Sequence, residues 1–247
     1  MKKRLLILGM IFTMAVSSAG CGNSSSDNSG KTDQTKQTAD VQDSQKDTSS
    51  SDKSDNKNDT SYKSADEITM DDLMSHDETP AEDFEFNDGT DEIVIEKYVG
   101  NDPIVVIPDE IDGKKVVGFE SAFTLNNNIV AVKIGNNVQE VENSAFSGCK
   151  QLKYVVMGDS VKTIGGRMFA QTNLQELVLN DGLQKIGQDD SNNVLAPPSS
   201  NCGMDLKIPE SVTELHVSEF NLIGKSGSYA EQYANEHADA GVTFTAE

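Results

Sequence analysis

Three cysteines and three histidines are the side chains best able to bind a metal or act as nucleophiles in this 247-residue chain. They are Cys21, Cys149, Cys202, His76, His216 and His237. Their spacing fits no zinc site, and no nucleophile elbow, phosphate-binding loop or metal-binding helix motif accompanies them. We therefore expect no catalytic centre, no metal site and no cofactor.

One acidic run offers hard oxygen ligands, at residues 189–193. It lacks the glycine and the distant bidentate glutamate of a calcium loop, so we do not predict a calcium site there. The whole chain has a formal net charge of −21. Binding to nucleic acid or to anionic lipid through charge needs basic patches, so this net charge argues against both kinds of partner.

An export signal occupies residues 1–21. Residues 2–4 are basic, and the apolar run at 5–16 is too short to span a bilayer. The run leads to Ser-Ser-Ala-Gly-Cys, which resembles the lipobox of bacterial lipoproteins, with Ser18 where leucine is usual. The resemblance implies diacylglycerol and palmitate on Cys21, and an extracytoplasmic, lipid-anchored, surface-exposed protein. The alternative is an ordinary secretory signal, cut after the small residues near Ala19 or Gly20, with no lipid on Cys21.

A polar stretch follows at residues 22–82 and is predicted to be a disordered tether. Up to residue 60 its only large apolar side chain is Val41, so burial cannot offset the entropy of ordering. Within the tether, residues 67–74 have an apolar spacing that allows a short helix.

Residues 83–247 contain a regular internal repeat, most visible at Ala122-Phe123, Ala145-Phe146 and Met168-Phe169. Each unit contains an L-x-x-L-x-L pattern, whose last pair alternates like a half-buried strand. One such coil buries too few side chains to stand alone, so the coils are expected to stack into a solenoid.

The repeat resembles the BspA-like leucine-rich repeats of bacterial surface proteins. The segments that carry the likeness are Val161–Phe169 and Val138–Leu152, the second containing Ala-Phe-Ser-Gly-Cys. The resemblance covers about residues 83–247 and implies a right-handed parallel solenoid at the cell surface. Some relatives are adhesins, and most have no known role.

We therefore predict a β-rich solenoid of about five coils with parallel strands and a short N-terminal β cap. A capping helix at 229–238 and a strand near 242–244 should end it, because Ser228 to Glu231 forms a capping box. Residues 187–203 interrupt the repeat and are predicted to be an inserted loop, either a tolerated surface loop or part of a binding face.

A disulfide between Cys149 and Cys202 is not expected. Cys149 occupies a slot that the BspA-like repeats usually fill with cysteine, which implies a buried thiol. Cys202 lies about two coils further on, roughly 9–10 Å along parallel strands. Disulfides need Cα atoms within about 7 Å.

The outward positions of the strands form two rows, which we predict as a possible ligand face. One row has Ala131, Tyr154 and Glu176, and the next has Lys133, Val156, Val178 and Lys207. Exposed aromatic and valine side chains side by side favour a contact patch, although valine also suits any exposed strand.

Two functions remain open. The first is a membrane-anchored surface lipoprotein that presents its repeats for protein or glycan binding, or for adhesion. The second is a structural envelope lipoprotein without a dedicated soluble ligand. A solute-binding lipoprotein would need two lobes around a cleft, and the repeat region at 83–247 leaves no room for them.

Overall fold

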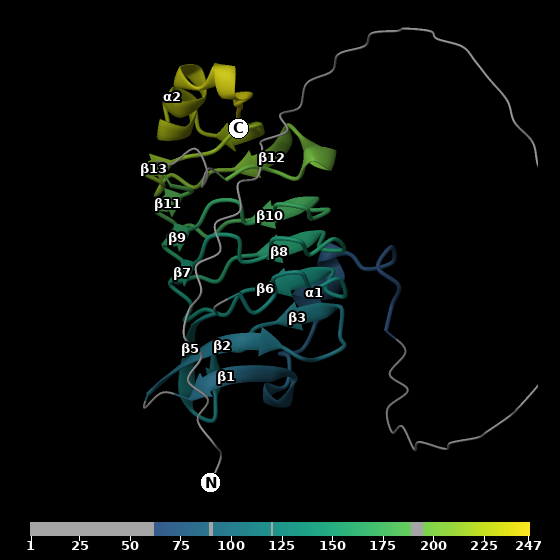
Figure 1. Ribbon diagram of the computed structural model, residues 1–247. Coiled ribbons are helices and arrows are strands. Elements are labelled where there is room, and N and C mark those ends of the chain that lie inside the picture. The colour runs from purple at the N-terminus through teal and green to yellow at the C-terminus, as the bar shows by residue number, and fades with distance from the viewer. Residues whose placement is uncertain (1–61, 89–90, 120, 189–194) are drawn as a thin grey trace, which may run out of the picture. The chain divides into compact units, whose positions relative to one another are not determined.

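The repeats stack so that strands from successive coils pair side by side (Figure 1). The structure, a computed structural model, describes residues 62–88, 91–119, 121–188 and 195–247. The first sheet, in the order β10-β8-β6-β3, comprises β3 (Ile104–Val106), β6 (Ala131–Lys133), β8 (Tyr154–Val156) and β10 (Glu176–Val178). All its strand pairs are parallel, as predicted.

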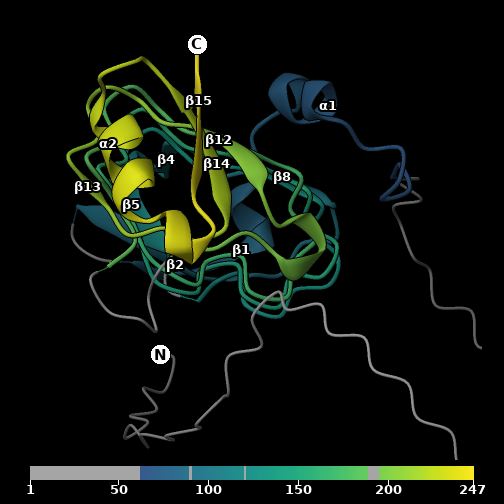
Figure 2. The same cartoon turned by 90° about the horizontal axis from the view of Figure 1, so that it is seen from above.

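A second parallel sheet runs beside the first, built from the next segment of each coil. It comprises β7 (Glu140–Val141), β9 (Thr163–Ile164), β11 (Lys185–Ile186) and β13 (Glu214–Leu215). Seen along the stack, the coils lie over one another (Figure 2).

Two further sheets lie at the ends of the stack. The N-terminal one has the order β1-β2-β5-β4, with β1 (Phe84–Asp88), β2 (Glu92–Tyr98), β4 (Glu110–Ile111) and β5 (Lys114–Phe119). The C-terminal one is parallel, with β12 (Met204–Lys207), β14 (Phe220–Gly224) and β15 (Thr243–Ala246). Strand β14 adds a coil that the regular period does not reveal, so the described residues form about six coils instead of the predicted five.

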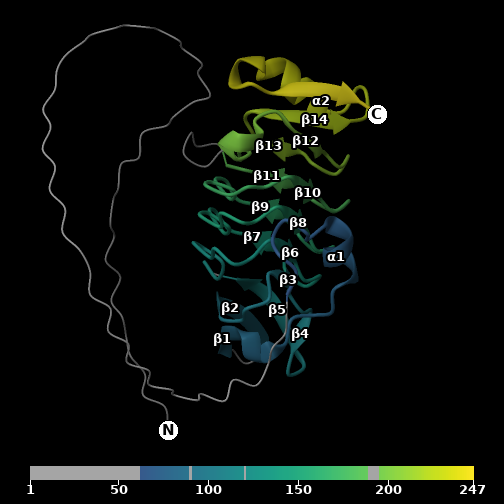
Figure 3. The same cartoon turned by 90° about the vertical axis from the view of Figure 1, so that its right-hand side faces the viewer.

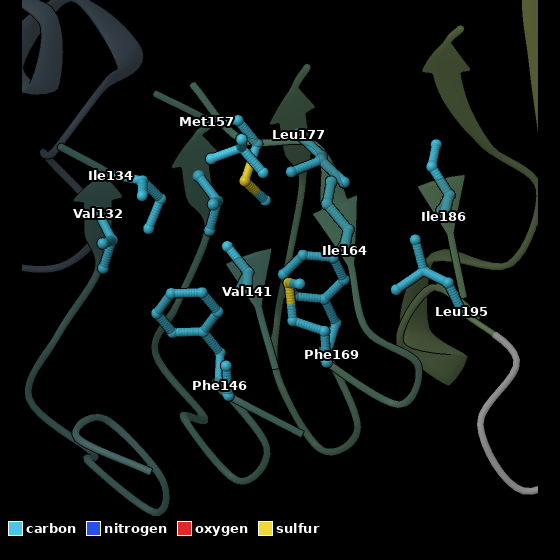
Figure 4. Close-up of a cluster of buried hydrophobic side chains, with 14 of the residues drawn as sticks. Val132, Ile134, Val141, Phe146, Met157, Ile164, Phe169, Leu177, Ile186 and Leu195 are labelled. Atoms are coloured by element: carbon cyan, nitrogen blue, oxygen red, sulfur yellow. The ribbon is translucent and has the colours of Figure 1, made fainter. Parts of the chain in front are cut away.

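Aliphatic and phenylalanine side chains fill the interior of the coils, and Figure 4 shows Phe146 and Phe169 among them. Phe123, Phe146 and Phe169 are fully buried, with successive ring centroids 5.5 and 6.4 Å apart. Each ring removes apolar surface from water only because the next coil covers it. The phenylalanine that recurs once in each of these coils therefore contributes to the cohesion between them, together with the buried aliphatic side chains.

Close stacking also explains two features of the turns. A Cβ atom on Gly158 would collide with the carbonyl group of Gly135 in the preceding coil, so a side chain has no room there. One recurring turn position has a left-handed backbone in three coils, with φ of 52° at Ser121, 61° at Ser144 and 53° at Arg167. None of these is glycine, so the stacked coils hold an unfavourable conformation in place.

The C-terminal helix α2 (Tyr229–Glu236) packs over β14 and β15. Its Ser228 cap is confirmed, because the Ser228 hydroxyl accepts a hydrogen bond from the Glu231 amide at 3.4 Å. The helix ends slightly earlier than the predicted residue 238, and a 3-10 turn (Ala238–Ala240) follows. The predicted strand near 242–244 is β15, which pairs parallel with β14.

Within the inserted segment at 187–203, Leu195 is part of the solenoid. This side chain is fully buried and bridges in parallel to Val217. Residues 189–194, which include the acidic run, lie outside the described residues. A 3-10 turn (Ser199–Asn201) then leads to β12.

Candidate functional site

The alternation of each strand in the first sheet divides its side chains between two surfaces. Val132, Val155 and Leu177 point into the coils and are almost completely buried. The flanking residues point away from the interior, and we call the surface they form the outer face. It comprises Ile104, Val106, Ala131, Lys133, Tyr154, Val156, Glu176 and Val178.

The predicted rows across the outer face are present as far as β10, but Lys207 does not continue the second row, because β12 belongs to the C-terminal sheet and does not pair with β10. Ala131 pairs with Tyr154, which pairs with Glu176. In the second row Lys133 pairs with Val156, which pairs with Val178. Lys207 lies on β12, and its ammonium forms an ion pair with Glu247 at 2.6 Å.

The exposure of the outer face is uneven, which corrects the expectation of an open patch. Ala131 is 0% exposed and Val156 only 8%, whereas Val178 is 39% exposed. Glu176 is also exposed, and Tyr154 is half-buried. The outer face is therefore covered at its N-terminal end and open at β10.

The cover is a segment of the chain itself, residues 62–75, which we call the arm (Figure 3). The arm contains helix α1 (Met70–Ser75), which lies against β3 and β6. Ile68 and Leu73 are 2% and 0% exposed, and they form a second apolar cluster with the outer face. The predicted tether boundary at residue 82 places these residues in the linker, whereas they pack on the repeats.

The helix in the arm forms for local reasons that the sequence contains. The Thr69 hydroxyl accepts a hydrogen bond from the Asp72 amide at 3.3 Å, and the Thr69 amide donates to the Asp72 carboxylate at 3.0 Å. This capping box satisfies two backbone donors at the helix start. The Lys63 ammonium and the Thr69 groups hold the pKa of Asp72 down at about 2.

Lys153 attaches the start of the arm to the coils. Its ammonium donates to the Ala65 carbonyl at 2.8 Å and lies 3.1 Å from the Asp66 carboxylate. The Lys153 side chain is only 9% exposed, whereas that of Asp66 is 98% exposed. Lys153 does not stand out in the sequence, because nothing in the repeat pattern distinguishes it from a solvated lysine.

The segment that follows the arm is fixed at the edge of β3. The Thr79 amide donates to the Val106 carbonyl at 2.9 Å, and the Val106 amide donates to the Thr79 hydroxyl at 3.0 Å. The His76 imidazole lies 3.4 Å from the Asp102 carboxylate. A pocket of about 270 Å³ remains between the arm and the residues before β3, lined by Lys63, Ile68, Asp72, His76, Asp102 and Ile104.

The cysteines and the other histidines have structural surroundings. Cys149 is a free, fully buried thiol that donates to the Phe123 carbonyl at 2.8 Å, so it forms no bridge to Cys202, as predicted. Burial raises the pKa of the Cys149 thiol to about 12. His216 lies 3.2 Å from Glu214, and the His237 ring stacks on Tyr233 with centroids 3.9 Å apart.

Metal-binding groups do not gather anywhere in the part of the chain that the structure describes. Over the same residues, no helix has the length and apolarity needed to cross a bilayer. Cys21 lies outside the described residues, so its lipidation stays a prediction. The outer face and its arm are thus the feature of the described residues best suited to binding.

Comparison with known proteins shows what the repeats are similar to. Residues 119–194 match six copies of the family described as BspA type leucine rich repeat region. A crystal structure of a leucine-rich repeat protein from T. pallidum is 29% identical, with a TM-score of 0.49, over 60% of this chain and 71% of that one. No curated protein matches the chain. Residues 119–194 of this chain are therefore similar to leucine-rich repeats of the BspA type.

Proposed function

We propose that this chain is a lipid-anchored surface protein that binds another protein through the uncovered part of its outer face. The observation that carries the proposal is Val178, an apolar side chain that is 39% exposed on β10, the last strand of the first sheet. On the neighbouring strand lies Tyr154, which pairs with Glu176 of β10. Leucine-rich repeats typically bind proteins through surfaces that extend across several repeats.

The chemistry of this surface fits a protein better than a small molecule. It combines a tyrosine and a valine with flanking charges on Glu176, Lys133 and Lys207. Aromatic anchors surrounded by polar groups are typical of protein interfaces. A glycan is the alternative ligand class, because tyrosine side chains also stack on sugar rings.

A binding comparison tests the proposal. The immobilised full chain is exposed to envelope and host extracts, beside a variant with Tyr154→Ala and Val178→Ser. We expect specific, saturable capture by the native chain and at least about a tenfold loss of affinity in the variant, since each interface anchor contributes roughly 1–2 kcal/mol. Glu140→Ala on the second sheet is the control and should bind like the native chain. Equal binding by all three proteins would contradict the proposal.

The anchor is a separate part of the proposal and has its own test. Cys21→Ser should move the chain from the membrane fraction to the soluble fraction, because two or more acyl chains are needed for stable anchoring. A chain that stays in the membrane fraction after this change is not anchored through Cys21. A chain that is anchored but captures no ligand in any extract would favour the structural envelope role.

A further inference from the structure

The arm contacts the outer face in the manner of a bound peptide. None of residues 62–75 belongs to a strand, and helix α1 has only six residues. Helices of this length are not stable in water by themselves, so the arm is ordered because it is docked. Its apolar contacts come from Ile68 and Leu73, which are buried in the cluster with Ile104, Val106 and Ala131.

The arm is attached through fewer buried side chains than the coils. Of its large apolar side chains only Ile68 and Leu73 are buried, Met74 is 54% exposed, and an open pocket of about 270 Å³ lies beside the arm. An attachment through two buried side chains removes much less apolar surface from water than the packing of a coil does. A segment held in this way can leave its site at a lower free-energy cost than any coil.

The charges of the arm and its site are complementary. The arm carries four carboxylates and one lysine, which gives it a net charge of −3. Beneath it, Lys153 is enclosed and bonded to arm residues, and Lys133 lies on the adjoining strand. Lys153 is a fixed cation that would donate hydrogen bonds to a carbonyl or carboxylate of any segment in the arm's place.

The covered and uncovered parts of the outer face are continuous. The row Lys133, Val156, Val178 begins beside the arm and ends on the open strand β10. We propose that residues 62–75 are a displaceable cover, and that the partner of the outer face is a short acidic amphipathic helix of another protein. This helix takes the place of the arm and continues to Val178. The inference rests on the proposed function and names the chemistry of its partner.

A synthetic peptide with the sequence of residues 62–76 is the probe, since it has the required chemistry. It is titrated into the isotope-labelled full chain and into a variant whose arm carries Ile68→Asp and Leu73→Asp. We expect amide shifts at Ala131 and Val156 in the variant, at concentrations that leave the native chain unchanged. The apparent affinities should differ at least about tenfold, because the attached arm competes at a high effective concentration.

Matched controls separate docking from nonspecific binding. A peptide with both aspartate substitutions should bind neither protein, and Ala131→Arg should abolish binding to the arm variant. Deletion of residues 62–75 provides a second opened protein in case the aspartates disturb folding, which circular dichroism checks.

Three outcomes would overturn the inference. If the peptide bound neither the arm variant nor the deletion variant, the site would not be a helix-binding site. The peptide would bind the native chain equally well if the arm is no cover. Dimers of the native chain that disappear on deletion of the arm would show exchange between copies instead. None of these uses Tyr154→Ala or Val178→Ser, so the proposed function stands or fails separately.

Discussion

The two apolar clusters of this protein are built by opposite means. The interior cluster runs from Phe84 to Val242 and repeats the same contacts in coil after coil. The outer cluster is small and joins Ile68 and Leu73 of the arm to a few strand residues. The first is made by a periodic sequence, and the second by one segment with no counterpart elsewhere in the repeats. The periodic sequence therefore holds the coils together. The unrepeated arm covers one part of the outer face and makes that part different from the rest.

The largest expected effect comes from the interior. Phe146→Ala removes a fully buried ring that contacts Phe123 and Phe169. It should lower the free energy of unfolding by about 3–5 kcal/mol, because a cavity remains between stacked coils. Chemical unfolding followed by circular dichroism measures this.

Val178→Ala on the open strand is the control for that experiment and should change the free energy of unfolding by less than about 0.5 kcal/mol. Equal effects of the two substitutions would mean that the interior and the outer face do not differ in their contribution to stability.

A smaller and more local effect is expected in the arm. Leu73→Ala removes a side chain that is 0% exposed, but the arm can detach without unfolding the coils. Hydrogen exchange over residues 62–75 should accelerate roughly tenfold or more, while the unfolding midpoint of the coils changes little. Met74→Ala on the same helix is the control and should leave exchange unchanged, since Met74 is 54% exposed. If Leu73→Ala lowered the unfolding midpoint as far as Phe146→Ala does, the two clusters would unfold as one cooperative unit, which would contradict this prediction.

The smallest expected effect is the opening of the arm as the pH falls. Hydrogen bonds from Lys63 and Thr69 lower the pKa of Asp72 to about 2. A carboxyl group whose pKa is lower in the folded chain than in the unfolded chain stabilises the fold at pH values above the unfolded pKa. This stabilisation is lost as the pH falls through the folded pKa. The arm should therefore open between about pH 4 and pH 2, before the coils unfold.

Carbon NMR of the Asp72 carboxyl group, recorded beside hydrogen exchange of the arm, measures this opening. In Asp72→Asn the acid step should be absent and the arm should already exchange faster at neutral pH. An acid step that persists in this variant would assign the pH dependence to another group.

The regular part of the fold was predictable because each coil repeats the same signals. The spacing of Phe123, Phe146 and Phe169 revealed the stack, and the L-x-L alternation placed Tyr154 and Val178 in their rows. The capping box at Ser228 revealed helix α2. Strand β14 was missed because Leu222 pairs with Leu206 after a shorter stretch of chain than the regular repeat, so this coil departs from the period.

The docking of the arm was not predictable from the same signals. Ile68 and Leu73 showed a helical spacing, but they lie in a polar stretch whose composition resembles a linker. Whether such a helix packs depends on a matching surface, which is formed by strands that come much later in the chain. Lys153 and Ala131 have ordinary repeat sequences, and only the folded coils show that they lie under the arm.

The interior and the outer face repeat with the same period, and this affects how the gene can evolve. Phe146 to Phe169 and Ala131 to Tyr154 are both steps of one repeat, so interior and outer face advance together. An in-frame duplication of one repeat would lengthen the stack and add one strand to each sheet while leaving both ends intact. Descendants of such a gene would acquire a longer outer face in a single genetic event, with the arm still packed only on its original end.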